Sequence, residues 1–288
     1  MKNIIKIIII FTGFYLIYTN RSLVILSTLK SIKMFNESLF PSIFPIIILS
    51  DFILSTNLIN IISKLIGNIF NKLFNISKVS SYVFILSCIS GSPSNSKYIK
   101  DLLDNKLITK KEAEKLLSFS CLYNPLLIIS LTKYLCLKDS IIIIIINIIC
   151  NILIGIINRN YKIDISNTLF KVKKFNLVES INKSINTLII LLGVVTFFNI
   201  LNGLININHP LISGIFEITS GLYLLNDYPI SYSSKLLYTG ILLSFSGLSI
   251  IIQTKSIFAK DTLDYSLFYK SRIIHLILMI IIIIFLYI

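Results

Sequence analysis

The chain has 288 residues, of which 55% are hydrophobic and 14% are charged, and its mean hydropathy is +0.86. A water-soluble domain of this composition would lack the polar surface needed to cover itself. The formal charge of +14 lies in short stretches between apolar runs, with no basic face that carries exposed aromatic residues. Nucleic acid is therefore excluded as a partner, and membrane orientation explains the charge. The composition predicts an all-α integral membrane protein that crosses the lipid bilayer several times.

Residues that ligate metals or catalyse reactions are sparse. The cysteines stand far apart without CxxC spacing and the chain has only two histidines, so we expect no metal site, no disulfide and no cofactor. The sequence has no HExxH or GxSxG motif and no pair of intramembrane aspartates within a recognisable motif. No catalytic residue is therefore assigned and no enzyme is expected. The histidines, His209 and His275, are expected at the membrane interface in structural roles.

Three apolar stretches lie within residues 1–54. Residues 4–18 are followed by a poor signal-peptide cleavage site, which favours a retained first span over a secretory signal. Residues 22–39 mix leucines with two lysines, as in a helix that lies in the interface or crosses the bilayer obliquely. Residues 40–54 contain two prolines and Asp51 and are too short to span comfortably, so they predict a re-entrant segment.

The next stretches are also short. Residues 58–74 place apolar side chains at helical spacing between asparagines and lysines, which predicts an amphipathic surface helix. The apolar run 82–90 stops at the sequence SGSPSNS, residues 90–96. Serine, glycine and proline in succession break a helix, so we expect a helix break here.

Residues 109–183 complete the first half and lead into the second. Thr109 and Glu112 form a capping box at the start of a polar helix, and Asn124-Pro125 interrupts the apolar stretch that follows. Residues 141–157 are nearly pure isoleucine and predict a span. Residues 159–183 hold six basic and two acidic residues, which predicts a cytoplasmic connecting loop.

The second half repeats this plan in a shorter form. Its apolar stretches are residues 186–205, residues 211–225 with Glu217, residues 236–252 with an interruption, and residues 273–288. The expected organisation is an N-terminal transmembrane helix at 1–20, a first repeat at 21–158 with a broken helix at 90–96, a basic connecting loop at 159–183, and a second repeat at 184–288 with a broken helix at 246–249.

Each half therefore offers a short apolar segment with one carboxylate, Asp51 or Glu217, followed by a helix that breaks at a Ser-Gly pair. Interrupted helices at matching positions of two halves point to a transporter binding site near the bilayer midplane, since freed backbone groups must meet a ligand, water or protein. The start of a half-helix suits an anionic group. Close helix packing remains the alternative for each break, and an interfacial position the alternative for each acid.

The candidate residues follow from these breaks. Asp51 and Glu217 are candidates for coupling or gating, with a proton or a cation as the coupling species. The candidates for binding a small-molecule substrate are Ser90, Gly91, Ser92, Ser94, Asn95, Ser96, Ser246, Gly247, Ser249 and Gln253.

The order of these motifs resembles a known family. Residues 40–54, SGSPSNSK at 90–97, LITKKEAEKLLSF at 107–119, FEITSG at 216–221 and SGLS at 246–249 with Gln253 are similar to the YlbJ-type sporulation integral membrane proteins of endospore-forming bacteria. That family carries a nucleoside-recognition gate domain and resembles concentrative nucleoside transporters. The resemblance implies two structural repeats with re-entrant and broken transmembrane helices.

The resemblance also implies a function, namely transport of dipicolinic acid across the outer forespore membrane during sporulation. A nucleoside-type solute is the alternative substrate. A hypothesis of another class is a non-transporting membrane scaffold for spore envelope assembly, for which the basic residues 171–174 would be essential. The residues leave open a homo-oligomer, and either the cell membrane or the outer forespore membrane as the location.

Overall fold

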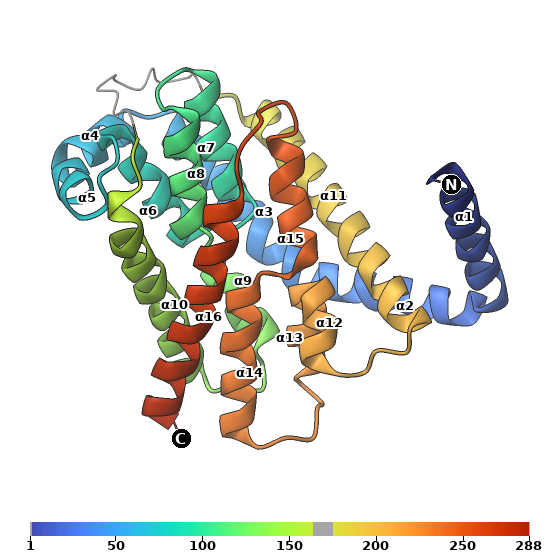
Figure 1. The fold of residues 1–288 in the computed structure, drawn as a ribbon. Helices are drawn as coiled ribbons and strands as arrows, with labels where there is room; N and C mark the ends of the chain where they lie inside the picture. Colours follow the sequence, from blue (N-terminus) through green and yellow to red (C-terminus); the bar gives the residue numbers. More distant parts are fainter. Residues whose placement is uncertain (1, 164–174, 288) are drawn as a thin grey trace.

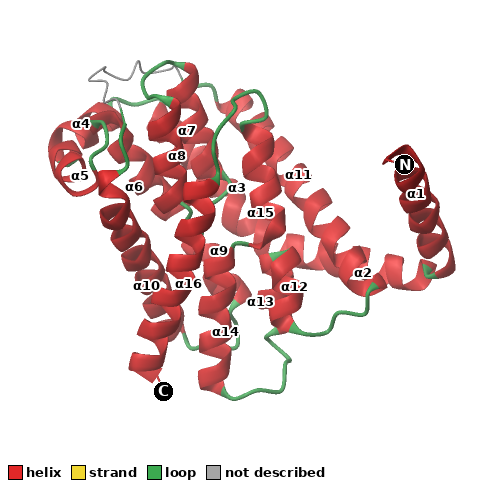
Figure 2. Ribbon diagram, viewed as in Figure 1, coloured by secondary structure: helices red, strands yellow, loops and turns green. Residues whose placement is uncertain are grey.

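The computed structural model describes residues 2–163 and 175–287, which fold into helices joined by turns and short loops, with no strand among them (Figure 2). The basic residues 171–174 lie outside the described residues. The helices, in chain order, are α1 (Lys2–Thr19), α2 (Arg21–Met34), the π-helical turn η1 (Phe35–Leu39), α3 (Phe40–Leu54), α4 (Leu58–Leu65), α5 (Gly67–Phe74), the 3-10 turn η2 (Lys78–Ser80), α6 (Ser81–Ser90), α7 (Ser94–Asp104), α8 (Lys110–Phe119), α9 (Pro125–Leu131), α10 (Leu137–Ile157), the 3-10 turn η3 (Asn158–Asn160), α11 (Leu177–Leu204), α12 (Pro210–Phe216), α13 (Ile218–Leu224), α14 (Tyr232–Phe245), α15 (Gly247–Ile257) and α16 (Ser266–Tyr287).

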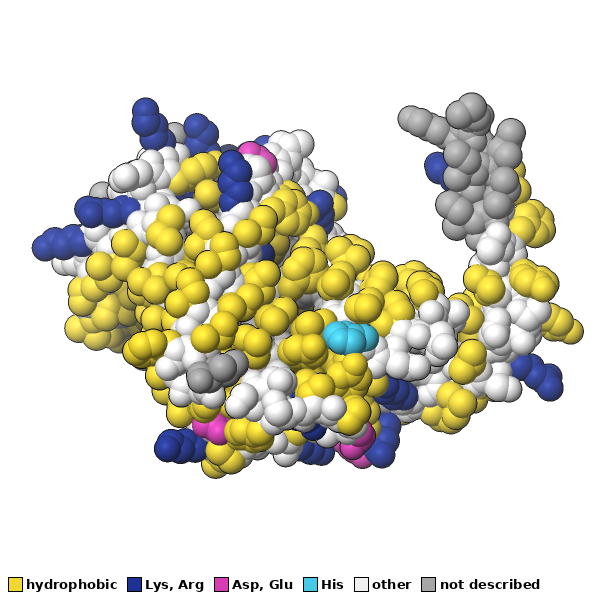
Figure 3. All heavy atoms as spheres, turned by 60° about the horizontal axis from the view of Figure 1, so that its bottom comes forward, with side chains coloured by type: hydrophobic (Ala, Val, Ile, Leu, Met, Phe, Trp, Pro, Cys, Tyr) yellow, Lys and Arg dark blue, Asp and Glu magenta, His cyan; other side chains and the backbone are white. Residues whose placement is uncertain are grey.

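Several of these helices can cross a membrane. A helix of about 20 apolar residues spans the roughly 30 Å of bilayer hydrocarbon. Within the described residues, five stretches meet this requirement of length and composition, and large apolar side chains cover much of the surface (Figure 3). The prediction of an all-helical protein with several spans is thereby confirmed. The five stretches are Arg21–Leu54, Leu137–Asn160, Leu177–Leu204, Tyr232–Ile257 and Ser266–Tyr287.

The N-terminal region differs from the prediction. α2, η1 and α3 form one stretch of 34 residues, because Leu39 and Phe40 both keep right-handed helical backbone angles. A separate re-entrant segment at 40–54 was therefore a wrong prediction, since the prolines lie within a continuous helix. α1 covers the expected first helix and stands apart from the bundle (Figure 1). Its described apolar part, Ile10–Thr19, is shorter than a span, so its crossing of the membrane stays a prediction.

The expected amphipathic helix at 58–74 is two helices, α4 and α5, which divide at Ile66. Gly67 allows this division, because a Cβ there would lie 2.8 Å from the Cβ of Lys78. α5 meets the helical stretch Lys78–Ser90 at an angle of 102°. The exposed side chains include Leu65 and Ile69, in keeping with a position beside lipid.

The first expected break reverses the chain. The Tyr82 hydroxyl at the start of α6 donates to the carbonyl of Tyr98 in α7 at 3.4 Å, and the Tyr98 hydroxyl donates to Ser90 Oγ at 3.1 Å. α6 and α7 therefore lie side by side as a helical hairpin whose tip is formed by residues 91–93, with Gly91 at φ +70°. We call this unit the first hairpin.

α8 and α9 together run beside α10. Asn158, just after α10, donates to Ser118 Oγ near the end of α8, and Thr132 pairs with Ser140 at the other end of α10. Residues 120–124 between α8 and α9 are not helical, so this first broken helix is interrupted partway along α10. The predicted capping box forms only in part, because the Thr109 side chain caps α8 whereas the Glu112 carboxylate accepts from Ser77 and Ser80. The expected interruption at Asn124-Pro125 is present, and the Asn124 side chain caps α9.

The second half has a matching pair of units. α12 and α13 fold back on each other with Glu217 at the tip, and Gly221 lies so close that a Cβ there would be 2.7 Å from the Cα of Gly214. We call this unit the second hairpin. α14 and α15 form the second broken helix, which is interrupted at Ser246 with φ +71° but still counts as one stretch, Tyr232–Ile257. The helix before them, α11, begins at Leu177, so the connecting loop ends earlier than residue 183.

The structure corrects the expected correspondence between the halves. Gly91 lies at a hairpin tip whereas Ser246 interrupts a single stretch, so these two positions are not equivalent. Each half instead contains a hairpin followed by a broken helix. The spacing from the hairpin tip to the following interruption is the same in both halves, because Cys121 follows Gly91 by 30 residues and Gly247 follows Glu217 by 30 residues. Asp51 lies within the continuous α3 and not at a hairpin tip, so its position does not correspond to that of Glu217.

Two ends of the bundle differ in their number of lysines and arginines. At one end, which we call the basic end, Lys110 contacts Thr262 and Tyr161 contacts Glu114, so the loops around residues 104–111, 158–163 and 258–265 lie together. At the opposite end, Tyr232 and Tyr287 both donate to Asp139. The loop and helix-end cations at the basic end include Lys106, Lys110, Lys111, Arg159, Lys162 and Lys260, whereas those at the opposite end include Lys133, Lys138 and Lys235.

This asymmetry predicts the orientation, with the basic end in the cytoplasm. Cys136 lies at the opposite end and is exposed, while Cys88, Cys121 and Cys150 are buried or partly buried. When the chain is expressed in a plasma membrane, a membrane-impermeant maleimide should label Cys136 in intact cells, and Cys136→Ser should remove the label. Labelling that requires permeabilised cells would place the basic end outside.

Candidate functional site

The tip of the first hairpin packs directly on the first broken helix. A Cβ on Gly91 would lie 2.2 Å from the backbone nitrogen of Asn124, so only glycine permits this approach. The Ser92 amide donates to the Leu122 carbonyl at 2.7 Å, and the Asn95 side-chain amide donates to the Ser120 carbonyl at 3.0 Å. The backbone groups that the interruption frees are thus partly satisfied by the hairpin tip, as burial in lipid requires.

The second hairpin and the second broken helix meet in the same way. Gly247 has φ +69°, and a Cβ there would lie 3.1 Å from the Ile218 nitrogen and 3.2 Å from the Gly214 carbonyl oxygen. The Ser249 hydroxyl donates to Glu217 Oε1 at 3.4 Å. α14 has 14 residues before the interruption and α15 has 11 after it, so this contact lies near the middle of the span.

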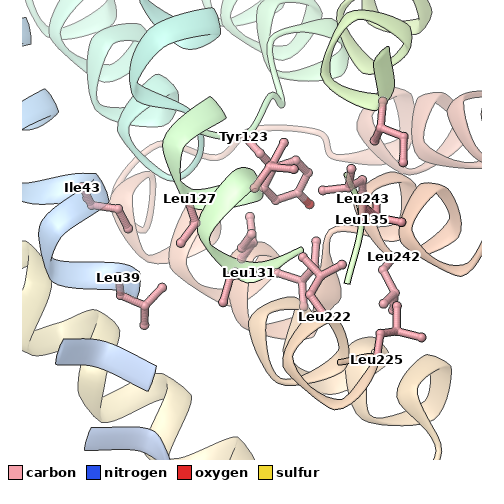
Figure 4. Close-up of a cluster of buried hydrophobic side chains, with 14 of the residues drawn as sticks. Leu39, Ile43, Tyr123, Leu127, Leu131, Leu135, Leu222, Leu225, Leu242 and Leu243 are labelled. Atoms are coloured by element: carbon pink, nitrogen blue, oxygen red, sulfur yellow. The ribbon is translucent and has the colours of Figure 1, made fainter. Parts of the chain in front are cut away.

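The two pairs of units also touch each other. Cys121 Sγ lies 3.5 Å from Ser246 Oγ, and the Ser96 hydroxyl donates to Thr254 Oγ1 at 3.4 Å. An apolar cluster that includes Tyr123, Leu222 and Leu243 also joins the two halves (Figure 4). We call the meeting point of residues 91–94, 120–124, 217–218 and 246–249 the junction. Both predicted breaks therefore lie at one place inside the bundle.

Glu217 is the carboxylate of the junction, and it is 2% exposed. Its Oε2 accepts from the Ser220 amide at 2.8 Å, from the Ser220 hydroxyl at 3.2 Å and from the Thr219 hydroxyl. Among the described residues, no cation lies within ion-pair distance of it. Glu217 therefore caps α13 and also stands at the start of α15, where the sequence predicted a solute anion.

A cavity of about 540 Å³ leads from the basic end toward the junction. At its outer end lie Lys183 and Glu179, whose side chains are each 59% exposed. At its inner end lie Ser94 and Tyr98, each 5% exposed. Since Ser94 is the first residue of α7, the cavity runs along α7 to the tip of the first hairpin. The positive end of the α7 dipole faces its floor.

Charged side chains line this cavity. Asp51 accepts a hydrogen bond from Ser180 at 2.9 Å, and Lys97 donates to Thr187. Of the predicted candidates, the cavity brings together Asp51 and Ser94. The other ten lie outside its lining. Six of these belong to the junction: Gly91, Ser92, Glu217, Ser246, Gly247 and Ser249. The remaining four are Ser90, Asn95, Ser96 and Gln253.

Sequence reasoning gave no role to Tyr123, which lies in the junction, or to Arg272 beside it, and it expected His275 at the membrane interface. Arg272 and His275 are 5% and 0% exposed, so the interfacial position expected for His275 was wrong. His275 Nδ1 lies 3.0 Å from Ser244 Oγ, and its Nε2 lies 3.1 Å from the Asn151 side-chain nitrogen. The apolar stretch predicted at 273–288 starts just after Arg272 and so left this residue out of the span, whereas α16 starts at Ser266 and includes it.

Comparison with known proteins gives one relative. No family model and no solved structure matches the chain. The sporulation integral membrane protein YlbJ of Bacillus subtilis (strain 168) is 22% identical over 295 aligned positions, which cover 84% of this chain and 72% of the relative. The chain is a homologue of YlbJ.

The resemblance to YlbJ-type proteins is thereby confirmed, and with it the multi-pass membrane location, which the five candidate spans support independently. The name of YlbJ refers to sporulation and to the membrane and names no solute. The gate domain and the relation to nucleoside transporters stay predictions.

Proposed function

We propose that this YlbJ homologue is a membrane transporter for a small anionic or aromatic solute. One observation carries the proposal: two hairpins and two broken helices, one of each from either half, meet inside the bundle. Discontinuous helices that meet near the midplane form the substrate and ion sites of many secondary transporters. A protein that needed only to stay in the membrane would gain nothing from such interruptions, because each one frees backbone groups inside lipid.

The cavity supports the proposal, because it gives a solute a route to the junction. Lys97 stands between the outer end and Ser94 and would attract an anion by charge. The start of α7 and the Ser94 hydroxyl offer further donors at the floor. Asp51 lines the same wall, so a bound anion would also weaken the attraction between Asp51 and Lys97.

The substrate we propose first is dipicolinic acid, moved across the outer forespore membrane during sporulation. Dipicolinate is a small planar dianion, which suits a path lined by the half-buried Lys97, hydroxyls and a helix start. The homology to a sporulation membrane protein fits this setting. A nucleoside-type solute is the alternative, which the neutral hydroxyl and amide groups of the junction would also accept.

The test is uptake of radiolabelled dipicolinate into liposomes that contain the purified chain. Wild type should exceed protein-free liposomes, and Lys97→Met should lower the initial rate about tenfold or more, since a hydrogen bond to a charged group contributes about 1.5–3 kcal/mol. Lys111→Met, which changes an exposed lysine of α8, should behave as wild type. Wild-type liposomes that take up neither dipicolinate nor nucleosides would remove the transport proposal and favour the scaffold.

A further inference from the structure

Arg272 is a buried cation in the middle of the molecule. Its guanidinium donates to the Ser118 carbonyl and to Asn151 Oδ1 at 3.0 Å each, and to the Cys121 carbonyl at 3.4 Å. It also lies over the ring of Phe268, at 5.7 Å. Within the described residues, it makes no ion pair. A charged arginine held in a membrane bundle by neutral dipoles alone is rare and usually marks a functional site.

The buried carboxylates are engaged elsewhere. Glu112 accepts from the Ser77 amide and the Ser80 hydroxyl, both at 2.7 Å. Glu114 accepts from Tyr161. Glu217 is held by the second hairpin, as described above. The charge of Arg272 is therefore balanced by no neighbouring group in this conformation.

Two donors at the interruption between α8 and α9 are left unused. The Arg272 Nε is buried without a hydrogen-bond partner, and the Tyr123 hydroxyl, which lies near Ser246, makes no hydrogen bond of good geometry. Both residues are 5% exposed. The Tyr123 ring lies among the apolar side chains of the junction, with its oxygen turned toward Leu243 in Figure 4. Buried donors without acceptors are uncommon in native proteins. An acceptor with negative charge would satisfy both.

We propose that Arg272 is the residue that recognises a carboxylate of the transported solute, with the Tyr123 hydroxyl as a second donor. This inference rests on the proposed transport function. When a solute enters the junction, the guanidinium exchanges its contacts with the Cys121 and Ser118 carbonyls for a carboxylate, which its planar fork binds with two hydrogen bonds. His275, one turn further along α16, positions this helix against α14 through Ser244.

The experiment measures equilibrium binding of radiolabelled dipicolinate to the purified chain, with picolinate, which lacks one carboxylate, measured by competition. Wild type should bind dipicolinate at least tenfold more tightly than picolinate. Arg272→Gln should reduce this ratio to threefold or less, because the second carboxylate then has no partner. Lys270→Gln, an exposed cation on the same helix, should keep the wild-type ratio. An unchanged ratio in Arg272→Gln overturns the inference.

Arg272 also caps the end of α8, so its replacement can weaken the fold. Tyr123→Phe removes a hydroxyl that makes no hydrogen bond of good geometry, so a structural role predicts undiminished thermal stability and unchanged binding. Our inference predicts undiminished stability with dipicolinate binding weakened three- to tenfold, and unchanged binding would contradict it. If wild type binds neither ligand, the proposed function falls together with this inference. If wild type prefers the dianion and both variants keep that preference, only the inference falls.

Discussion

Gly91→Ala should unfold the first hairpin. The position has φ +70°, and the added Cβ would lie 2.2 Å from the Asn124 nitrogen and 2.7 Å from the Tyr123 carbonyl carbon. The left-handed backbone alone costs an alanine about 1 kcal/mol or more. The overlap involves backbone atoms on both sides, so relief requires the hairpin tip to leave the first broken helix. We expect a total loss of roughly 4 kcal/mol or more, a size reserved for such steric conflicts.

The measurement is the midpoint of thermal unfolding in detergent, followed by the tryptic digestion pattern. Gly193→Ala is the matched control, because no atom lies within 4 Å of a Cβ at that position in α11. It should leave the midpoint unchanged or raise it slightly, since alanine favours helix more than glycine does. A Gly91→Ala protein as stable as the control would show that the hairpin tip and residues 120–124 do not touch in the membrane.

The helical class, the membrane location and several helix ends could be predicted because they depend on local chemistry. Apolar length alone identified α10, and the Thr109 side chain accepts from the Glu112 amide as a capping box requires. The break after Ser90 was visible because no helix continues through Gly91 and Pro93. Each of these signals lies within a few neighbouring residues.

The pairing of elements could not be predicted, because it depends on contacts between distant residues. An apolar stretch of 15 residues reads the same whether it turns back or continues a neighbouring helix. The structure joins 40–54 to α2, and it folds residues 211–225 into a hairpin because Gly214 and Gly221 touch. The interruption at 120–124 gave only the Asn-Pro signal, so its contact with the interruption at Ser246 could not be predicted.

The candidate residues show the same limit. The sequence placed serines and carboxylates at breaks, and the structure gathers most of them at the junction. The sequence cannot show, however, which hydroxyls are free to bind a solute. The Ser249 and Ser220 hydroxyls, for example, donate hydrogen bonds to Glu217. The cations that we propose to meet the solute, Lys97 and Arg272, were not among the predicted binding residues. Their position follows from how α7 and α16 pack.

Glu217→Gln should abolish the dependence of solute transport on a proton gradient while the solute can still cross the membrane. Glu217 is buried among hydroxyl and amide donors without a cation, and a lone carboxylate inside lipid is costly to keep charged. We therefore expect it to take up a proton when a solute anion occupies the junction, because protonation removes the competing charge at the start of α15. Glutamine keeps the size and one acceptor but cannot exchange a proton.

In liposomes, wild type should accumulate dipicolinate when the pH gradient is imposed in the productive direction. Glu217→Gln should lose that accumulation about tenfold or more, yet keep exchange of external for internal dipicolinate at zero gradient. Asp51→Asn is the matched control, since Asp51 lies near the cavity wall and bonds to Ser180, and it should retain the gradient dependence if Glu217 alone carries the proton. A Glu217→Gln protein that still accumulates solute against its gradient would exclude this glutamate as the coupling group. If Asp51→Asn loses accumulation instead, the coupling group is Asp51 in the cavity.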